Sequence, residues 1–485
     1  MGLILSLLIV LSSFIAYQVY RIQCQRNEIV RRNECGTVVQ HWTLEPFTGF
    51  DFQIKMHMSI PFLHQLHQRY RHTFQVGTLI SHPALITTAK ENICGINSSK
   101  DFGVEPMRLP GMEYFCGKGF ITTDGDTWNH SKRMLRPSFD GSNLRDLSIL
   151  RDEIDTLLES LPKDGSASDL QPLLYTAFLN SALYFVLGVL PSQISNDAPL
   201  TAEKFVKSFH GALVYSMFRT VLGRAWKLLP QARYIQTCAT AHKFIDFYVE
   251  KALQEHDHND ITRCKRSLMK DLASQTDDKA YIRYQVIQGM MAAQDTTSEL
   301  LTNAFFLLAR NSEYWTRLHT EIVEAGDERF EVDRLIASKL ISNILLETLR
   351  ICPIFPLIGR VALRDTKLPV GGGLQQDLPV FVPQGTKVVM SYYSVHRNES
   401  VFGDDVETFR PDRWDDIHPA QWEFMAFGGG NRTCLGRQKA LIEASYVLAR
   451  FGHAFEGIRS MDSREWQGEL KMTCKSANGC KVAFY

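Results

Sequence analysis

The chain has 485 residues, 45% of them hydrophobic, with 53 basic and 53 acidic side chains and a formal net charge of zero. That length allows two or three ordinary domains or one large fold. The balanced charge, without a basic run, argues against a nucleic-acid-binding protein, which would need a basic patch. Ten cysteines are scattered from Cys24 to Cys480 without a C-x-x-C pair, which predicts reduced, unpaired thiols facing the cytosol.

The first twenty residues predict a membrane anchor. Residues 2–20 carry no charge, and as a helix they would span about 28 Å, close to the hydrocarbon thickness of a bilayer. A cleaved signal peptide would need a basic start, a shorter apolar core and an A-x-A-like site, none of which occurs. A buried core helix would rarely lie at the extreme terminus, directly before an arginine cluster. The following arginines place the rest of the chain in the cytosol, so we predict an anchor over residues 1–20, a basic linker over 21–45 and one globular domain over 46–485.

Loops and a first helix come next along the chain. Glycine, serine, asparagine and proline predict loops over residues 97–110 and 190–199. Trp128 and Lys132 are four residues apart, so on a helix they share a face. The ordinary interpretation of such a pair is an aromatic ring packed beside a solvated lysine.

A helix without proline is predicted over residues 282–310. Asp295, Thr296 and Thr297 interrupt its middle, and all three compete for backbone hydrogen bonds and are mediocre helix formers. A locally satisfied polar patch or a solvent-facing side would be the ordinary interpretation. Methionines and alanines precede the three residues and leucines follow them, so the stretch is not purely polar.

A second apolar helix face is predicted over residues 337–350. Glu347 and Arg350 lie three residues apart on it, which is ordinarily a surface ion pair worth a few tenths of a kcal/mol. Residues 356–361 and 378–394 have the composition of strands, with turn residues between the two halves of the later stretch.

Residues 427–436 read FGGGNRTCLG and directly precede an amphipathic helix. Cys434 would lie near the helix N-terminus, where free N–H groups and the helix dipole favour a thiolate. The glycines keep the backbone clear for a flat group, and Arg432 offers a planar fork of donors to a carboxylate. Together these features suit a haem that is bound through sulfur, and without a C-x-x-C-H motif the haem would be held non-covalently. A phosphate loop is the alternative, but neither G-x-G-x-x-G nor G-x-x-x-x-G-K-[ST] occurs.

Phe427, Gly430, Arg432, Cys434 and Gly436 match the F-x-x-G-x-R-x-C-x-G signature, so the chain resembles the cytochrome P450 haem-thiolate monooxygenases. The resemblance implies a mainly helical fold with small β-sheets. It implies haem b (iron protoporphyrin IX) as the cofactor and Cys434 as the axial ligand of its iron. The reaction implied inserts one atom of O2 into a substrate and releases the other as water.

The same resemblance gives roles to the earlier motifs. Trp128 and Lys132 correspond to a W-x-x-x-R motif that binds a haem propionate, with lysine in place of arginine. Arg360 falls where the family often has a second propionate-binding cation. The Asp-Thr-Thr motif resembles [AG]-G-x-[DE]-T-[TS], which implies that Asp295 and Thr296 relay protons on the distal side of the haem.

Two further features follow from this resemblance. Ala293 stands at the usual glycine position, which predicts a less distorted helix and a tighter oxygen pocket. Glu347 and Arg350 match E-x-x-R, and Arg413 lies in an F-x-P-x-R-W motif over residues 409–414. These three residues imply a buried, charge-compensated network that braces the cysteine loop.

The resemblance also implies partners and a location. Residues 365–373 and 382–385 are similar to those of fungal microsomal alkane and fatty-acid hydroxylases. Electrons would come from NADPH through NADPH–cytochrome P450 reductase, with cytochrome b5 as an optional donor, since the sequence has no flavin or nucleotide motif. The protein would be single-pass in the endoplasmic reticulum membrane. Residues 51–115 and 201–229 would shape an apolar pocket for a lipid, terpenoid or polyketide, with fungal secondary metabolism as one setting, and nothing selects among these substrates.

Two other functional classes stay open. A haem-thiolate isomerase or dehydratase would keep Cys434 without needing a proton relay, so the intact Asp295–Thr296 pair argues against it. A non-catalytic haem-binding sensor or carrier would need neither that pair nor a reductase. NADPH-dependent oxygen consumption would separate both from a monooxygenase.

Overall fold

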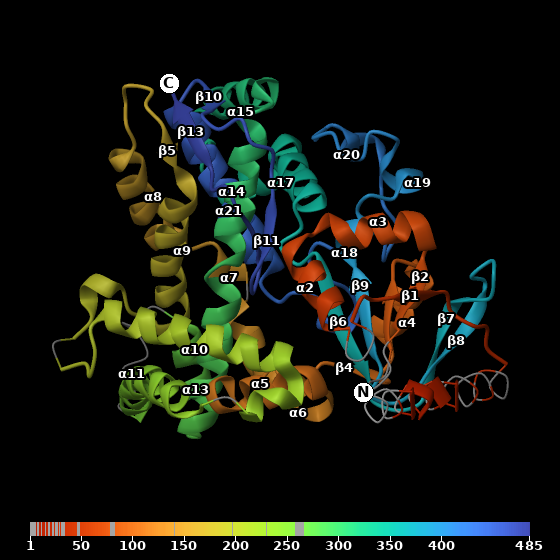
Figure 1. Ribbon diagram of the computed structural model, residues 1–485. Helices are drawn as coiled ribbons and strands as arrows, with labels where there is room; N and C mark the ends of the chain where they lie inside the picture. The colour runs from red at the N-terminus through yellow and green to blue at the C-terminus, as the bar shows by residue number, and fades with distance from the viewer. Residues whose placement is uncertain are drawn as a thin grey trace. The chain divides into compact units, whose positions relative to one another are not determined.

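The computed structural model describes residues 34–485 apart from 46–48, 78–82, 140, 196, 229 and 258–265, together with scattered positions before residue 34 (Figure 1). The predicted anchor over residues 1–20 lies largely outside the described residues. Its described members are helical, and Ile9, Val10 and Phe14 among them are exposed. Within the described part of the chain, one helix, α9 (Leu170–Leu187), has the length and mean hydropathy of a membrane span. Half of it is buried in the protein, which is also typical of a core helix.

The residue contacts divide the chain into two compact units, which are described separately. The β-rich unit and the helical unit each combine three stretches of sequence: Met1–Gly103, Leu357–Val395 and Gly429–Arg432 for the first, and Val104–Pro356, His396–Gly428 and Thr433–Tyr485 for the second. The mainly helical content with small sheets confirms that part of the predicted fold class.

A six-stranded mixed sheet forms the β-rich unit (Figure 1). Its strands lie in the order β1 (Gln40–Trp42), β2 (Thr73–Gly77), β3 (Ala84–Thr87), β9 (Lys387–Ser391), β6 (Leu357–Ala362) and β4 (Phe102–Gly103). A separate hairpin and short helices complete the unit: β7 (Thr366–Gly372) and β8 (Leu378–Val382), α2 (Phe50–Met58), α3 (Pro61–Tyr70), α4 (Lys90–Ser98), α18 (Tyr392–Val395) and the 3-10 turn η5 (Gly430–Arg432). Strand β1 lies within the linker predicted over residues 21–45. It is paired with β2, so this part of the predicted linker belongs to the sheet.

The β-rich unit has its own small core. Phe74 and Val76 are two residues apart on β2, so their side chains lie on one face of the sheet. Both are buried and pack with Phe52, Leu63 and Ile86. The predicted strand character of residues 356–361 and 378–394 is confirmed by β6, β8 and β9, except that residues 392–394 begin the short helix α18.

The helical unit contains the long helices and two small sheets. Its helices in chain order are α5 (Glu105–Cys116), α6 (Gly125–Leu135), α7 (Gly141–Leu144), α8 (Ser148–Ser160), α9, α10 (Ala202–Leu222), α11 (Ala232–Asp257), α12 (Leu268–Ala273), α13 (Lys279–Ala293), α14 (Thr296–Leu308), α15 (Ser312–Glu324), α16 (Val332–Ala337), α17 (Lys339–Ile351), α19 (Glu399–Phe402), α20 (Arg413–Asp416) and α21 (Arg437–Ala454). Its 3-10 helices are η1 (Arg136–Phe139), η2 (Pro191–Gln193), η3 (Gly223–Leu228) and η4 (Gly326–Glu328), and its strands are β5 (Ser168–Asp169), β10 (Ile458–Ser460), β11 (Gly468–Leu470), β12 (Cys474–Ser476) and β13 (Lys481–Phe484).

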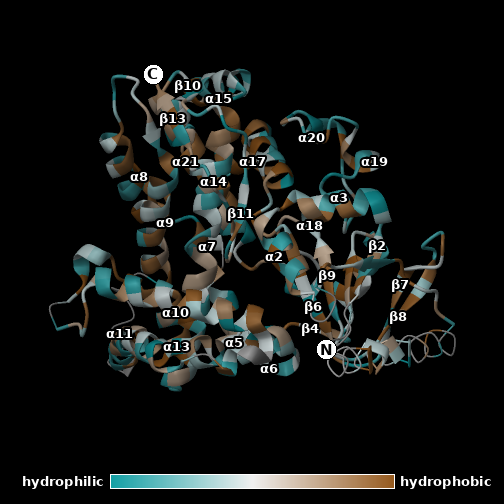
Figure 2. Ribbon diagram, viewed as in Figure 1, coloured by the Kyte–Doolittle hydropathy of each residue, from teal (hydrophilic) through white to brown (hydrophobic). Residues whose placement is uncertain are grey.

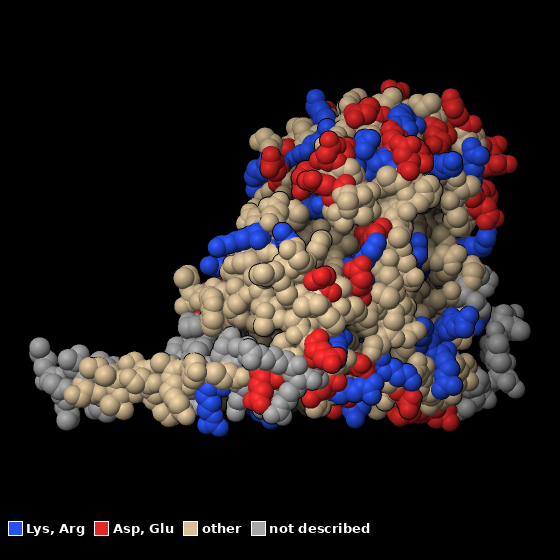
Figure 3. Space-filling view, turned by 90° about the vertical axis from the view of Figure 1, so that its right-hand side faces the viewer, with Lys and Arg blue, Asp and Glu red and all other residues tan. Residues whose placement is uncertain are grey.

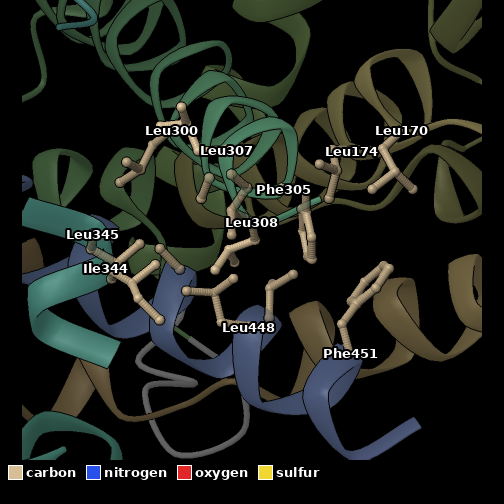
Figure 4. Packing of buried hydrophobic residues seen from close by; sticks show 14 of the residues in the cluster. Leu170, Leu174, Leu300, Phe305, Leu307, Leu308, Ile344, Leu345, Leu448 and Phe451 are labelled. Carbon is tan, nitrogen blue, oxygen red and sulfur yellow. The ribbon is translucent and has the colours of Figure 1, made fainter. Parts of the chain in front are cut away.

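Helix α14 forms the centre of the helical unit's main core. Every residue from Thr297 to Leu308 is buried, including the polar side chains of Ser298, Glu299 and Asn303. Leucine and phenylalanine side chains of α14 pack against α9, α17 and α21 (Figure 4). The predicted apolar face of α17 is buried in this core. In Figure 2 α17 is largely hydrophobic, whereas α15 and α20 are largely hydrophilic.

The predicted helix over residues 282–310 is interrupted. It forms α13 and α14, with Gln294 and Asp295 between them. The Thr296 hydroxyl donates to the Ala292 carbonyl at 3.0 Å, and this side-chain hydrogen bond competes with the regular backbone pattern. The prediction of one continuous helix over residues 282–310 is therefore wrong, and the effect of Ala293 on the distortion stays a prediction.

One predicted loop is also corrected. Residues 97–110 include the first half of α5, whose first turn contains a proline. Proline is tolerated there because the first N–H groups of a helix have no intrahelical partner.

Charged side chains on the surface are mixed in sign: over most of the charged area in Figure 3, basic and acidic residues are interspersed.

Candidate active site

The loop that carries Cys434 is closed by its own backbone hydrogen bonds. The Cys434 N–H donates to the Phe427 carbonyl at 3.0 Å, and the Gly428 N–H donates to the Met425 carbonyl at 3.0 Å. Gly428 has a φ of 68°, in the left-handed region that favours glycine. These contacts fix where the backbone places the cysteine.

The N-terminus of α21 lies beside the Cys434 thiol. Desolvation raises the pKa of this thiol, while the N–H groups of Gly436 and Arg437 and the Arg437 guanidinium oppose the rise. The helix terminus thus acts in the predicted direction, while desolvation acts against it and has the larger effect. The Cys434 side chain is closely surrounded by protein and is still exposed to solvent. A metal ion can therefore reach the sulfur, and its binding would remove the thiol proton.

The surroundings of Cys434 fit a haem. Among the described residues, no group of three or more histidine, cysteine, aspartate or glutamate side chains could hold a metal ion. An iron ion on Cys434 would therefore take its other ligands from its cofactor, as haem provides. A Cβ atom on Gly436 would lie 3.7 Å from Phe139 Cε1 and 3.9 Å from Cys434 Sγ, so glycine leaves space beside the sulfur.

Glu347 lies at the centre of a buried, saturated cluster. Neither Glu347 nor Arg350 is exposed, so this is no surface ion pair. The Glu347 carboxylate accepts two hydrogen bonds from Arg350 and one from Arg413, each at 2.9 Å. It also accepts from the Arg410 backbone N–H and the Trp414 indole N–H at 3.0 Å. The three residues that the motifs grouped lie together, and their bracing role stays a prediction.

Hydrogen bonds lead from this cluster to the cysteine loop. Arg350 Nη1 donates to the His396 carbonyl at 3.1 Å, and the Met425 N–H donates to His396 Nε2 at 2.9 Å. The Met425 carbonyl in turn accepts from Gly428. Desolvation and two nearby arginines lower the pKa of His396 to about 3. The neutral ring can therefore accept the bond that positions the loop.

The interruption between α13 and α14 leaves a small accessible area that we call the helix window. Residues 285–309 are buried except for Ala292, Ala293 and Thr296, which form this window. Asp295, next to it, is 6% exposed, and its Oδ1 has no hydrogen-bond partner among the described residues. The small side chains leave room for a ligand, the hydroxyl is accessible to it, and the acid lies behind them.

Asp295 belongs to a polar cluster that the sequence did not indicate. Asp295 Oδ2 lies 3.6 Å from Lys475 Nζ, and Glu299 Oε1 lies 3.4 Å from the same nitrogen. Gln171 Nε2 donates to Glu299 Oε2 at 3.4 Å. We call Asp295, Lys475 and Glu299 the acid–lysine cluster.

The predicted propionate-binding residues are divided between the two units. In the helical unit, Lys132 Nζ lies 4.9 Å from the centre of the Trp128 ring on α6, so the two side chains share a face as expected. Arg360, Gly430 and Arg432 belong to the β-rich unit. Arg360 is 8% exposed and lies on β6. The contacts of all these residues with haem stay predictions.

Three residues of these clusters were missed by sequence reasoning. Glu299 could have been found, because it lies four residues after Asp295 and such pairs share a helix face. Lys475 and His396 lie far along the chain from their partners. Only the fold brings them together, so no local pattern could have indicated them.

The chain is similar to known proteins over most of its length. The family model described as "Cytochrome P450" matches residues 40–470. A cytochrome P450 monooxygenase of Fusarium mangiferae, FPY7, is 30% identical over 479 residues, which cover 95% of this chain and 91% of that protein. Cytochrome P450 52E1 of Candida apicola is 34% identical over 400 residues, 79% of this chain and 77% of that protein. The cytochrome P450 monooxygenase himC of Aspergillus japonicus is 34% identical over 416 residues, 82% of this chain and 73% of that protein.

Proposed function

Because the chain belongs to the cytochrome P450 monooxygenase family, whose members bind haem b through a cysteine thiolate, we propose that it inserts one atom of O2 into an apolar organic substrate. In this proposal Cys434 would hold the haem iron through its thiolate. The observation that carries it is the helix window, because an otherwise buried helix exposes two alanines and the Thr296 hydroxyl, with the Asp295 carboxylate next to them.

The chain's own residues bind, orient and move protons in this reaction. When bound, haem supplies the activation of dioxygen, and electron donation from the Cys434 thiolate favours cleavage of the O–O bond. Asp295 holds a proton on its carboxylate and passes it toward the oxygen. The Thr296 hydroxyl keeps a water molecule in place for that transfer. Ala292 and Ala293 leave room for the substrate, which excludes bulk water from the site.

We assign the electron supply to NADPH–cytochrome P450 reductase, with cytochrome b5 as an optional donor. Residues 1–20 would anchor the protein in the endoplasmic reticulum membrane with the catalytic domain in the cytosol, as the uncharged segment and the arginines after it favour. Deleting residues 1–20 should move the protein out of the membrane fraction with haem binding intact. A glycan on Asn97, which lies in an Asn-Ser-Ser sequence, would instead show the reverse orientation.

An apolar substrate is proposed because the regions assigned to its pocket carry apolar side chains. Residues 51–115 and 201–229 are proposed to shape its pocket. The second region includes α10, where Val214 and Phe218 are 54% and 61% exposed. A spectral-shift screen of the purified protein against fatty acids, alkanes, terpenoids and polyketides should find ligands among them and would select the class.

The haem ligand is tested by spectroscopy. The reduced carbon monoxide adduct should show the red-shifted Soret band of a thiolate-bound haem. Cys434→Ala should abolish that band, and Cys434→His should move it to the position expected for imidazole ligation. A variant without the cysteine that kept the thiolate spectrum would refute the assignment.

Turnover tests the reaction class. With reductase and a ligand from the screen, the protein should consume NADPH and oxygen and form an oxygenated product. Conversion of a substrate without NADPH and oxygen would indicate a haem-thiolate isomerase or dehydratase. Haem binding without any turnover would indicate a sensor or carrier.

A further inference from the structure

Two buried carboxylates, Asp295 directly before α14 and Glu299 on it, share one ammonium group. Glu299 lies one helical turn after Asp295, so both side chains lie on the same side of the helix. Glu299 is 1% exposed and Asp295 is 6% exposed. Lys475, on β12, lies 3.4 Å from one carboxylate and 3.6 Å from the other, and its side chain is 22% exposed. The lysine is therefore the member of the acid–lysine cluster that solvent reaches most easily.

The charges of the acid–lysine cluster balance only if one carboxylate carries a proton. With both ionised, one buried negative charge has no partner charge in the cluster, and an unpaired buried charge is costly. Desolvation raises the pKa of Glu299 to about 7, although Lys475 lowers it. Near neutral pH, Glu299 therefore exchanges between acid and carboxylate.

The other titratable groups that face the cluster come from three elements. Lys475 Nζ lies 5.0 Å from the centre of the Tyr175 ring on α9, and the Tyr175 hydroxyl lies 2.5 Å from Nε2 of His210 on α10. Cys474 precedes the lysine on β12. Burial raises the pKa of Tyr175 and Cys474 and lowers that of His210. These three groups stay neutral near pH 7 and do not compete with Glu299 for the exchange.

The two oxygens of the Asp295 carboxylate have different surroundings. Its Oδ2 is the atom that faces Lys475. Its Oδ1 is buried and has no partner among the described residues. A buried acceptor without a partner is costly, so such an atom in a native site indicates a ligand or a transferred proton.

We propose that Glu299 holds the proton that recharges Asp295, with Lys475 as the carrier between them. This inference rests on the proposed function, because Asp295 must first give up a proton. As Lys475 gives a proton to the Asp295 carboxylate, it takes one from protonated Glu299. One O–H bond breaks at Glu299, one forms at Asp295, and the lysine keeps its charge. Solvent then returns a proton to Glu299 through the partly exposed lysine. Because Glu299 affects the reaction only through Asp295, it is a positioning residue.

The proton on Glu299 is tested without turnover. An infrared pH titration of the full-length, haem-loaded protein should show a buried carboxylic acid that ionises near pH 7. Glu299→Gln should remove this signal, and Lys475→Met should move it to higher pH, because Lys475 lowers the Glu299 pKa. Glu443→Gln is the matched control, since Glu443 is also buried and paired with a lysine, Lys439. A signal that persists in Glu299→Gln would overturn the assignment.

The transfer is tested by coupling, the product formed per NADPH consumed. Glu299→Gln should lower coupling by about tenfold or more and remove its change near pH 7, with ligand affinity and haem content unchanged. Glu299→Asp, which keeps an acid, should restore part of the loss, and Glu443→Gln should keep the coupling and its pH dependence. Glu299→Gln with the coupling of the unmodified enzyme would refute the relay. An unmodified enzyme without turnover would refute the proposed function instead, and the infrared titration would then decide the proton-holding role alone.

Discussion

Two buried charge clusters of the helical unit differ in how completely they are hydrogen bonded. The Glu347 carboxylate accepts from five donors at 2.9–3.0 Å. In the acid–lysine cluster, two carboxylates share one ammonium group at 3.4 and 3.6 Å, and one oxygen of Asp295 has no partner among the described residues. A saturated cluster keeps a single protonation state and fixes geometry, whereas an incompletely satisfied one can gain or lose a proton at small cost. Burial of charge alone therefore does not separate a structural cluster from a functional one.

Breaking the saturated cluster should have the largest effect. Glu347→Ala or Arg350→Ala leaves an unpaired buried charge, which costs about 3–5 kcal/mol of folding free energy. Little haem-loaded protein should be recovered, as measured by haem content and thermal unfolding. Arg317→Ala is the control, because the Arg317–Asp412 pair is 48% and 44% exposed and should contribute at most about 1 kcal/mol. Normal haem content in both cluster variants would contradict the bracing role.

Substitutions of Asp295 and Thr296 should change turnover and leave the fold intact. Thr296→Ala should keep the haem spectrum and ligand affinity but consume NADPH and oxygen with release of peroxide instead of product. Asp295→Asn should slow turnover by about 10²–10⁴-fold, the usual contribution of a general acid–base group. Tight coupling in Thr296→Ala would argue against its role and reopen the other reaction classes.

His396 should make the fold sensitive to acid. Its pKa is about 3 in the folded protein against an ordinary value of 6.5. Below about pH 6.5 the unfolded chain binds a proton that the folded protein excludes, so the stability present above that pH is lost by about 1.4 kcal/mol per pH unit. His396→Gln should unfold less steeply on acidification, as measured by denaturation at several pH values. His418→Gln, at an exposed histidine, should keep the slope of the unmodified protein, and parallel curves for His396→Gln would contradict the prediction.

Glu299 should change the pH dependence of stability in the opposite direction to His396, and by a smaller total amount. Its pKa rises from 4.5 to about 7 on folding, so the stability present below about pH 4.5 is lost as the pH rises to about 7, by about 3 kcal/mol in total. Glu299→Gln has no such loss, so relative to the unmodified protein it should become more stable as the pH rises through this range. Equal pH dependence of the two unfolding free energies would show that Glu299 does not titrate there.

The sequence predicted the saturated cluster better than the acid–lysine cluster. Glu347 and Arg350 lie three residues apart, but local spacing alone predicted a surface ion pair. Their grouping with Arg413 came from the resemblance to the cytochrome P450 motifs. The strands β6, β8 and β9 and the face of α17 followed from local composition. Lys475 reaches Asp295 only through the hairpin of β11 and β12, and a contact of such separation leaves no periodic pattern.

The interruption of the predicted helix has a different cause. One helix was predicted over residues 282–310 from the absence of proline, although Asp295, Thr296 and Thr297 are mediocre helix formers. The Thr296 hydroxyl donates to the Ala292 carbonyl at the break and competes with the backbone pattern. At Cys434 the sequence predicted the effect of the helix terminus but not the desolvation that opposes it, because desolvation depends on the surrounding fold. A helix terminus can be read from sequence, whereas the amount of protein packed around a sulfur atom cannot.

The pairing of β3 with β9 affects how the protein is made. The two parallel strands join residues 85–87 to residues 388–390, so the ribosome must add about 300 residues before β3 gains this neighbour. At about 5–20 residues per second, synthesis of that stretch takes about 15–60 s. Throughout this interval one edge of β3 has no strand to bind, and unpaired edges promote association with other chains. The yield of folded protein should therefore depend on how well this edge is protected during translation.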